Sequence, residues 1–436
     1  IMTPSDVVLS GAISGTGGII KTGSKSLTLS GGNSFSGGLS VLQGVLRLGN
    51  GGAVGSGALT IDGTAGEVQI RSDGVLGRTV ANSYSLNGTV RLGETATGLV
   101  SFDGLGTLAG NSKVIVEGSA NLSTLNLQSA VLTASIGNGE QLGIGGKISG
   151  TGSIEVSGMG VLRLSGANVF SGGTRVIDGK LSVESDQALG AGTLEFSGSG
   201  SLLATGDRTA DNPIDLNIAP GKSLVVGYNG GANQGGSITL GGPVRLQADA
   251  SLVVYDRVVF KGPVSGNFGM SFWSYGSKGL YGNNTFTGGT TLGHGMLYIG
   301  SDTALGSGPL VIAQSSGSAP ALRADGDRTL SNPYTLSIET TSIRLDTDVG
   351  SFAFLGEGKL TSDVSLKLPA GRGVTMSGGI KGNFALRKTG EYGSAANLTL
   401  DGENTFSQLI VDIGKVTFRG GRAMSDSGSV TVNQLA

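Results

Sequence analysis

The sequence predicts an all-β fold, a parallel β-helix (β-solenoid), and three observations support this prediction. A phrase of about 50 residues returns four times, short alternating apolar runs fill the chain, and glycine accounts for 82 of 436 residues. A long-period repeat built of short strands is typical of stacked coils that bury their apolar faces only against neighbouring coils.

The repeat opens with a glycine-rich phrase and continues to Asn, Phe and, in three copies, a glycine pair. The openings lie at Gly11, Gly146, Gly262 and Gly378, at offsets of 135, 116 and 116 residues. No polar linker separates the copies, which favours one β-helix over a string of sandwich domains. We therefore expect one continuous β-helix over residues 1–436, a single elongated rod, with repeat units of approximately 11–145, 146–261, 262–377 and a partial 378–436.

The strands are expected to be short and joined by tight turns. In residues 27–62, runs of roughly 3–5 residues alternate in hydrophobicity and are separated by glycine turns. Glycine suits such turns because it adopts positive φ without strain. No stretch has a convincing helical pattern. If a coil takes about 20–25 residues, the chain holds roughly 18–20 coils.

Composition excludes several classes of function. The formal net charge is −2 and no long run of one sign occurs, so we expect no nucleic-acid partner. No run of 18 apolar residues occurs, so no membrane-spanning helix is expected. The absence of Cys excludes disulfides, thiol catalysis and Cys-based metal sites. We predict no cofactor.

The cleanest copy of the repeat resembles the passenger-associated β-strand repeat of autotransporters. Its matching segments are 162–173 (LRLSGANVFSGG), 179–183 (GKLSV) and 188–194 (ALGAGTL). The first unit departs from the pattern at Val54, where Leu is usual, and the fourth is degenerate after Phe406.

The resemblance implies a right-handed parallel β-helix that is exported across the outer membrane of a Gram-negative bacterium, to the cell surface or as a secreted protein. It also implies a C-terminal β-barrel translocator following Ala436 in the full precursor. Passengers of this family include adhesins, immune-evasion binders, toxins, proteases and esterases.

A search for catalytic residues favours a protein that is not an enzyme. The single His, His294, aligns with Gln43 and Asp178 in the other units, so we expect a solvated turn there. No Gly-x-Ser-x-Gly elbow occurs. The pairs Asp325/Asp327 and Asp346/Asp348 have the i, i+2 spacing that places two carboxylates on one face of a strand. They could bind a cation or hydrolyse a glycoside, but we favour a polar outer face, and predict neither a catalytic nor a metal site.

One segment departs from the repeat because it is rich in aromatic residues. Residues 268–298 hold seven of the 22 aromatic residues, including the only Trp. If Phe272 faces the core, Trp273 and Tyr275 face outwards. Exposed Trp and Tyr are enriched in binding hot spots and glycan-stacking surfaces. The candidate partner-binding residues, which replace Ser157, Met159, Ser165 and Gly152 of the second unit, are Trp273, Tyr275, Tyr281 and Phe268. The alternative is a local thickening of the core.

Three functional hypotheses follow. The first is a surface-displayed binding or virulence protein, an adhesin or an immune-evasion captor of a host protein or glycan. The second is a passive stalk for a further functional domain. The third is a β-helix polysaccharide lyase or hydrolase, which the scarcity of His and of clustered carboxylates disfavours. Self-association through exposed backbone edges is a further possibility.

Overall fold

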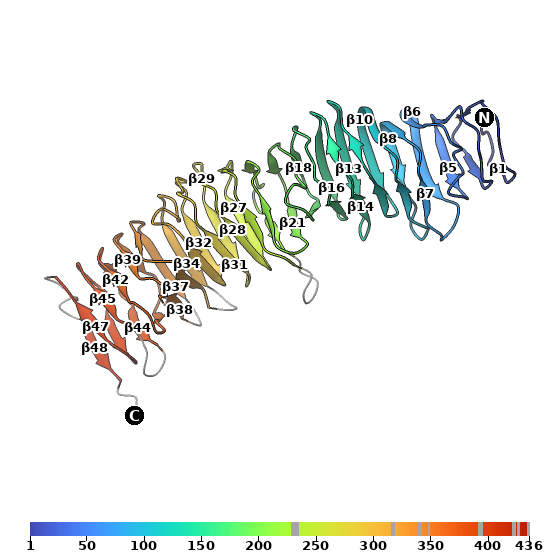
Figure 1. The fold of residues 1–436 in the computed structure, drawn as a ribbon. Helices are drawn as coiled ribbons and strands as arrows, with labels where there is room; N and C mark the ends of the chain where they lie inside the picture. The colour runs from blue at the N-terminus through green and yellow to red at the C-terminus, as the bar shows by residue number, and fades with distance from the viewer. Residues whose placement is uncertain are drawn as a thin grey trace. The chain divides into compact units, whose positions relative to one another are not determined.

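The computed structural model of the protein describes residues 1–227, 235–314, 319–338, 342–347, 349–390, 396–420, 424 and 428–433. Their contacts group them into two units, Ile1–Asn212 and Pro213–Ala436. Within each unit, short strands are stacked turn upon turn (Figure 1). The described residues contain no helix.

Unit 1 is built from two parallel sheets. The strands of sheet A are β1 (Val7–Leu9), β2 (Ile19–Lys21), β3 (Ser26–Leu29), β4 (Leu39–Val41), β5 (Gly44–Leu48), β6 (Leu59–Ser72), β8 (Tyr84–Leu92), β10 (Gly106–Val116), β12 (Leu125–Asn126), β13 (Val131–Ile136), β15 (Ile148–Ser149), β16 (Ser153–Gly158), β18 (Thr174–Val176) and β20 (Leu194–Phe196). Those of sheet B are β7 (Arg78–Val80), β9 (Val100–Phe102), β11 (Ala120–Leu122), β14 (Gln141–Ile144), β17 (Val161–Leu164), β19 (Lys180–Val183) and β21 (Gly200–Ala204). Strand β22 (Arg208–Ala210) follows.

Unit 2 has four sheets. Sheet C contains β24 (Leu224–Val226), β27 (Ala250–Val254), β30 (Met270–Trp273), β32 (Thr290–His294), β34 (Leu310–Gln314), β37 (Tyr334–Ile338), β40 (Gly358–Leu360) and β43 (Ile380–Lys381). Sheet D contains β25 (Ile238–Leu240), β28 (Arg257–Phe260), β31 (Ser277–Leu280), β33 (Met296–Ile299), β35 (Ala321–Ala324), β38 (Ile343–Asp346), β41 (Val364–Lys367), β44 (Ala385–Thr389), β46 (Gln408–Val411) and β48 (Ser429–Val432). Sheet E contains β36 (Arg328–Leu330), β39 (Phe352–Phe354), β42 (Val374–Met376), β45 (Leu398–Leu400) and β47 (Val416–Phe418), and sheet F contains β23 (Ile214–Leu216), β26 (Val244–Leu246) and β29 (Val264–Ser265).

The strands pair in parallel with the equivalent strand of the next turn, which confirms the predicted parallel β-solenoid of about 18 turns. Leu162 pairs with Leu181, for example, and Phe272 pairs with Leu292. Side chains alternate along most strands, so one row of apolar residues fills the interior and the next row faces out. The right-handed winding and the single continuous rod over residues 1–436 stay predictions.

The repeated Asn joins three successive turns. The side-chain oxygen of Asn168 accepts a hydrogen bond from the backbone N–H of Ile148, at 2.7 Å, in the turn before. Its amide group donates to the carbonyl of Ala188, at 2.6 Å, in the turn after. Asn33 and Asn284 make the same pair of bonds. Each bond satisfies a backbone group that the turn would otherwise bury without a partner, so the repeat encodes turn-to-turn connections.

The repeated Phe is the core residue beside this Asn. Phe35, Phe170, Phe286 and Phe406 are all buried. The Ala-Leu-Gly loop of the following turn packs on the ring, and a Cβ on Gly190 would lie 2.9 Å from a ring carbon of Phe170. Gly190 also has a φ of +61°, and this conformation is a second reason for glycine at this position. These two constraints explain why the phrase returns in successive units.

Three lysines are buried in the interior beside turns of the chain. The Lys21 ammonium donates to the carbonyls of Gly23 and Gln43, at 2.6 and 2.8 Å. Lys278, in the third repeat, donates to the carbonyls of Ser274 and His294, which align with Gly23 and Gln43. Lys388 donates to the carbonyl of Ile413, at 2.5 Å. Burial lowers the pKa of all three.

Candidate functional site

The aromatic corner is the turn from β30 to β31 in unit 2, together with the end of β32. Met270 and Phe272 of β30 are buried, whereas the Trp273 side chain is 43% exposed and that of Tyr275 is 68% exposed. The alternation expected from the sequence, with Phe272 in and the two larger aromatic residues out, therefore matches the structure.

Trp273 lies against a glycine in the next turn. The pairing of β30 with β32 shifts after Phe272, so that Trp273 pairs with His294 and Gly293 is the extra residue of a β-bulge. A Cβ on Gly293 would lie 2.4 Å from the Trp273 ring. The aligned residues of the first two units are Leu42 and Ile177, whose side chains would occupy this space.

His294 lies between the two exposed rings. Its ring is stacked near Tyr275, with centroids 6.1 Å apart and an interplanar angle of 27°. Its edge-to-face contact with Trp273 spans 6.5 Å. The sequence predicted a solvated turn for His294, but the residue is half-buried at the end of β32. It belongs to the aromatic corner together with Trp273 and Tyr275.

Lys278 supports this corner from the inside. It is fully buried, and its ammonium donates to the carbonyl of Ser274, between the two exposed rings in sequence, and to that of His294 at 2.9 Å. Burial lowers the pKa of Lys278 to about 8. One ammonium thus connects the carbonyl of Ser274, which lies between Trp273 and Tyr275 in sequence, with the carbonyl of His294.

Tyr281 lies on the next sheet rather than in the corner. It follows β31 and is half-buried. A Cβ on Gly279 or Gly300 would lie 2.6 or 2.2 Å from its ring, so the ring covers two glycines of successive turns. Desolvation, and then the neighbouring Asp325 carboxylate, raises the pKa of Tyr281. Its contacts are with sheet D.

Phe268 is separated from the other candidates. It lies in the loop before β30 and is 38% exposed, whereas Trp273 ends that strand. Phe268 thus precedes β30, which begins at Met270, and Trp273 lies at the other end of that strand. The structure therefore brings together Trp273 and Tyr275, adds His294, places Tyr281 on the neighbouring sheet and leaves Phe268 apart.

Tyr298, on β33, forms a second group of side chains beside Tyr281. The guanidinium carbons of Arg257, on β28, and Arg323, on β35, each lie 5.7 Å from the centroid of the Tyr298 ring. Tyr298 was counted in the aromatic segment but was not chosen as a site residue. A signal was available in the sequence, because the aligned residue of the second unit is Ser182.

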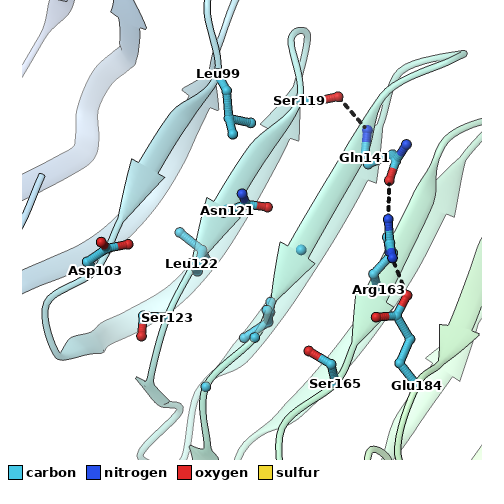
Figure 2. A pocket seen from close by; sticks show the side chains of 14 residues that line it. Leu99, Asp103, Ser119, Asn121, Leu122, Ser123, Gln141, Arg163, Ser165 and Glu184 are labelled. Atoms are coloured by element: carbon cyan, nitrogen blue, oxygen red, sulfur yellow. Dashed lines mark hydrogen bonds and ion pairs between the residues drawn. The ribbon is translucent and has the colours of Figure 1, made fainter. Parts of the chain in front are cut away.

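Unit 1 carries a polar groove of about 550 Å³ on the outer face of sheet B (Figure 2). Figure 2 shows a chain of contacts from Ser119 through Gln141 and Arg163 to Glu184 along one side. Arg163 donates to Gln141 at 3.0 Å and to Glu184 at 2.6 Å. The guanidinium is thus neutralised within the protein, and the groove has no aromatic side chain in its lining.

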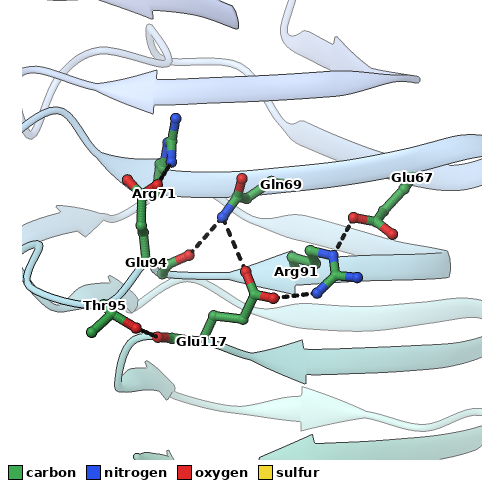
Figure 3. Close-up of polar contacts among 8 residues, drawn as sticks. Glu67, Gln69, Arg71, Arg91, Glu94, Thr95 and Glu117 are labelled. Carbon is green, nitrogen blue, oxygen red and sulfur yellow. Dashed lines mark hydrogen bonds and ion pairs between the residues drawn. The ribbon is translucent and has the colours of Figure 1, made fainter. Parts of the chain in front are cut away.

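The outer face of sheet A in unit 1 carries a network of ion pairs (Figure 3). Arg91 bridges Glu67 and Glu117, and Arg71 pairs with Glu94. The hydrogen bond with Glu67 is the main cause of the raised pKa of Arg91. Arg71 is buried, whereas Arg91 and its two partners are partly exposed, and exposed ion pairs contribute little stability each.

The acidic pairs do not come together as an active site. Asp327 accepts hydrogen bonds from the backbone N–H and the hydroxyl of Ser351 in the next turn. Asp346 pairs with Arg344, and Asp348 lies outside the described residues. Within the described part of the chain, no group of three or more His, Asp or Glu side chains is arranged to hold a metal ion. That part also has no helix long and apolar enough to cross a membrane.

Comparisons with known proteins agree with the repeat. Residues 19–48, 154–183 and 280–299 match the family described as passenger-associated-transport-repeat. Over 209 residues, or 48% of this chain, the sequence is 31% identical to the adhesin BmaC autotransporter of Brucella suis biovar 1 (strain 1330). The match spans 5% of the length of that relative. No solved structure matches. The chain carries passenger-associated transport repeats, and is distantly similar to an autotransporter adhesin.

Proposed function

We propose that this chain is part of an autotransporter passenger exported to the bacterial cell surface, where it acts as an adhesin without being an enzyme. Its partner is a host surface molecule, bound at the aromatic corner formed by Trp273, Tyr275 and His294. The repeats and the similarity to an autotransporter adhesin support the class, and the corner supports the location of the binding surface.

The observation that carries this proposal is a comparison between repeats. Met159, in the second repeat, is 68% exposed, as is Tyr275 at the aligned position. The fold therefore leaves this position in solvent whichever residue occupies it, which argues against a thickened core. Large exposed aromatic side chains gain binding energy when a partner covers them, and Trp and Tyr are enriched in hot spots.

Gly293 adds independent support. It replaces the aligned Leu42 and Ile177, and the Trp273 ring occupies the space that their side chains would need. A glycine in a strand costs conformational entropy and often marks a bulge or a close approach. The third repeat thus differs from the first two at the exposed rings of Trp273 and Tyr275, and also at Gly293, against which the Trp273 ring packs.

The test replaces the corner with the residues of the second repeat. We would measure binding of the labelled, purified chain to cultured host epithelial cells, and compare it with the variant Trp273→Ser/Tyr275→Met/His294→Asp. These residues occupy the same positions in another repeat, so the fold should tolerate them. Loss of a hot-spot cluster is worth about 2 kcal/mol or more, which predicts at least a ~30-fold weaker apparent affinity.

A matched control changes the other repeat instead. Met159→Ala removes an equally exposed apolar side chain at the aligned position, and should leave binding unchanged. Equal binding by the wild type and the corner variant would remove the corner as the site. If the wild type bound no host cell or matrix preparation, the stalk hypothesis would replace the adhesin, and products released from acidic polysaccharides would favour the enzyme.

A further inference from the structure

The polar groove on the outer face of sheet B has a floor made of two glycines. Gly143 lies on β14 and Gly145 directly follows that strand, so the two positions face the same side of the sheet. A Cβ on Gly145 would lie 3.8 Å from its nearest neighbour, the Ser165 hydroxyl, so the space above this glycine is open. A Cβ on Gly143 would lie 2.6 Å from the amide oxygen of Asn121, whose side chain therefore leans over the floor.

The floor is specific to this place in the chain. When the repeat openings are aligned, the residues at the position of Gly143 are Val8 and Val259. Val8 is 64% exposed, so a side chain at this position projects from the sheet. Gly143 pairs with Asn121 in the turn before and with Arg163 in the turn after, so the missing side chain leaves a hollow between those two. Glycine inside a strand weakens it and often marks a site that a ligand approaches closely.

Polar side chains stand on both sides of this floor. Asn121 and Ser123 come from the turn before it, and Arg163 and Ser165 come from the turn after it (Figure 2). Because neighbouring turns lie about 4.8 Å apart, the backbones of the two walls are roughly 10 Å from each other. The groove volume of about 550 Å³ lies within the range of sites that hold small organic ligands, about 300–1,000 Å³.

The polar groups around the floor differ in whether the protein already uses them. Arg163 is bound to Gln141 and Glu184, so its charge is balanced. Other side chains that line the groove make no hydrogen bond or ion pair with any residue that the structure describes, namely Asp103, Asn121, Ser123 and Ser165. They supply a carboxylate, an amide and two hydroxyls, so the groove offers both donors and acceptors to a ligand.

A ligand in this groove meets side chains rather than free backbone groups. Strands β9, β11, β14 and β17 are each paired on both edges, so their N–H and C=O groups are already hydrogen-bonded. A peptide therefore has no strand edge to extend here. The lining holds two carboxylates and one guanidinium, and the guanidinium is paired with Glu184, so the unpaired Asp103 disfavours an anionic ligand.

We propose that this groove binds a neutral oligosaccharide, whose hydroxyl groups form hydrogen bonds with Asp103, Asn121 and Ser123. Sugar hydroxyls both donate and accept, which matches the mixed set of groups in the groove, whereas an amine would satisfy Asp103 alone. Leu99, which is 39% exposed in the lining, offers an apolar contact for the C–H face of a sugar. The inference goes beyond the proposed function and is independent of it, because the groove belongs to unit 1 and the aromatic corner to unit 2.

The experiment measures binding of the full chain to immobilised oligosaccharides by surface plasmon resonance. The neutral probes are tetramers of glucose, galactose, mannose and N-acetylglucosamine. A sulfated heparin octasaccharide and an octamer of lysine serve as the anionic and cationic comparisons. We expect a neutral probe to bind with an affinity that changes little as salt is raised, because salt screens only charged groups.

The variant Gly143→Val fills the floor with the residue found at the aligned positions, and should bind the neutral probe at least ~10-fold more weakly. Asn121→Ala should weaken binding about 5-fold, the equivalent of one hydrogen bond. Thr79→Val is the matched control, because Thr79 faces outwards in the same row, two turns before Asn121, and lies outside the lining. It should leave binding unchanged.

Urea unfolding of each variant shows whether the fold is intact. Should Gly143→Val unfold more readily, Asn121→Ala, which only shortens an exposed side chain, decides the outcome. No binding of any neutral probe, tighter binding of either charged probe, or full binding by both groove variants would each overturn this inference.

The outcome is separable from the proposed function. The corner variant Trp273→Ser/Tyr275→Met/His294→Asp should keep its affinity for the neutral probe, and Gly143→Val should keep its binding to host cells. Loss of the neutral probe in the corner variant would overturn the groove as the sugar site. Loss of cell binding in the corner variant alone would retain the adhesin whatever the groove binds.

Discussion

The same corner of the solenoid is built differently in the second and third repeats. In the second repeat it presents Ser157, Met159 and Asp178, and its interior positions are the buried apolar residues Val156 and Leu162. In the third repeat it presents Trp273, Tyr275 and His294. The core position aligned with Leu162 is Lys278, a buried ammonium that donates to two corner carbonyls.

The first repeat shows that these two changes are separable. In the first repeat the ammonium belongs to Lys21, which precedes the corner and aligns with Phe272 of the third repeat. The residues that align with Trp273 and Tyr275 are Thr22 and Ser24. An ammonium at this corner is therefore compatible with small exposed residues. The exposed residues of this corner are therefore free to change, and the aromatic rings were not required to build the turn.

The largest effect is expected from removing the ammonium of the third repeat. Lys278→Met would leave the carbonyls of Ser274 and His294 without this donor, while removing a desolvated charge. A buried unsatisfied polar group costs about 1–3 kcal/mol, and relief of the charge offsets part of this cost, so we expect a net destabilisation of about 1–2 kcal/mol. Equilibrium urea unfolding followed by Trp273 fluorescence measures it.

Lys21→Met is the matched control for this prediction. It removes the ammonium that occupies the equivalent corner in unit 1. That ammonium also donates to the carbonyl of Thr22, at 3.2 Å, which keeps the backbone N–H of Thr3 as a donor. The native Trp273 emission should change in Lys278→Met and stay unchanged in Lys21→Met. An unchanged emission spectrum in both variants would show that Lys278 does not position the aromatic corner.

A pH dependence should follow from the same lysine. Burial lowers the pKa of Lys278 to about 8, from an ordinary value of 10.5. Between these values the unfolded chain binds more protons than the folded chain, so this group makes the folded state more stable as pH rises. The wild type should gain about 1 kcal/mol over Lys278→Met between pH 8 and pH 10.5, once screening is allowed for. Paired urea titrations at the two pH values measure the gain, and a constant difference would contradict it.

The sequence predicted the fold better than it predicted the site. The parallel solenoid was recoverable because Asn168 and Phe170, with their aligned partners, each satisfy a requirement that recurs in each repeat unit. The outward direction of Trp273 and Tyr275 followed from alternation around Phe272. Both inferences used periodicity, which a sequence displays directly.

The rest of the site depends on contacts between turns. His294 lies beside Trp273 because a bulge at Gly293 shifts the pairing of β30 with β32. The alternation of apolar and polar residues in the sequence does not reveal a shift of one residue. The stack on Tyr298 combines residues from β28 and β35, which are separated in sequence by more than 60 residues. Lys278 was missed because a lysine on a short strand ordinarily faces solvent.

The smallest effect is expected from transferring the aromatic corner into the second repeat. In a Trp273→Ser background, Ser157→Trp/Met159→Tyr/Asp178→His would place one Trp at the aligned position. Because Met159 and Asp178 are exposed and Ser157 is half-buried, we expect a change in unfolding free energy of no more than about 1 kcal/mol. Ile177 stands where Gly293 seats the Trp273 ring, so the transferred Trp should be more exposed and emit at longer wavelength than Trp273. Adding Ile177→Gly should move the emission back towards that of Trp273. If it does not, the glycine is not what seats the ring, and the difference between the two corners must arise from the bulge itself.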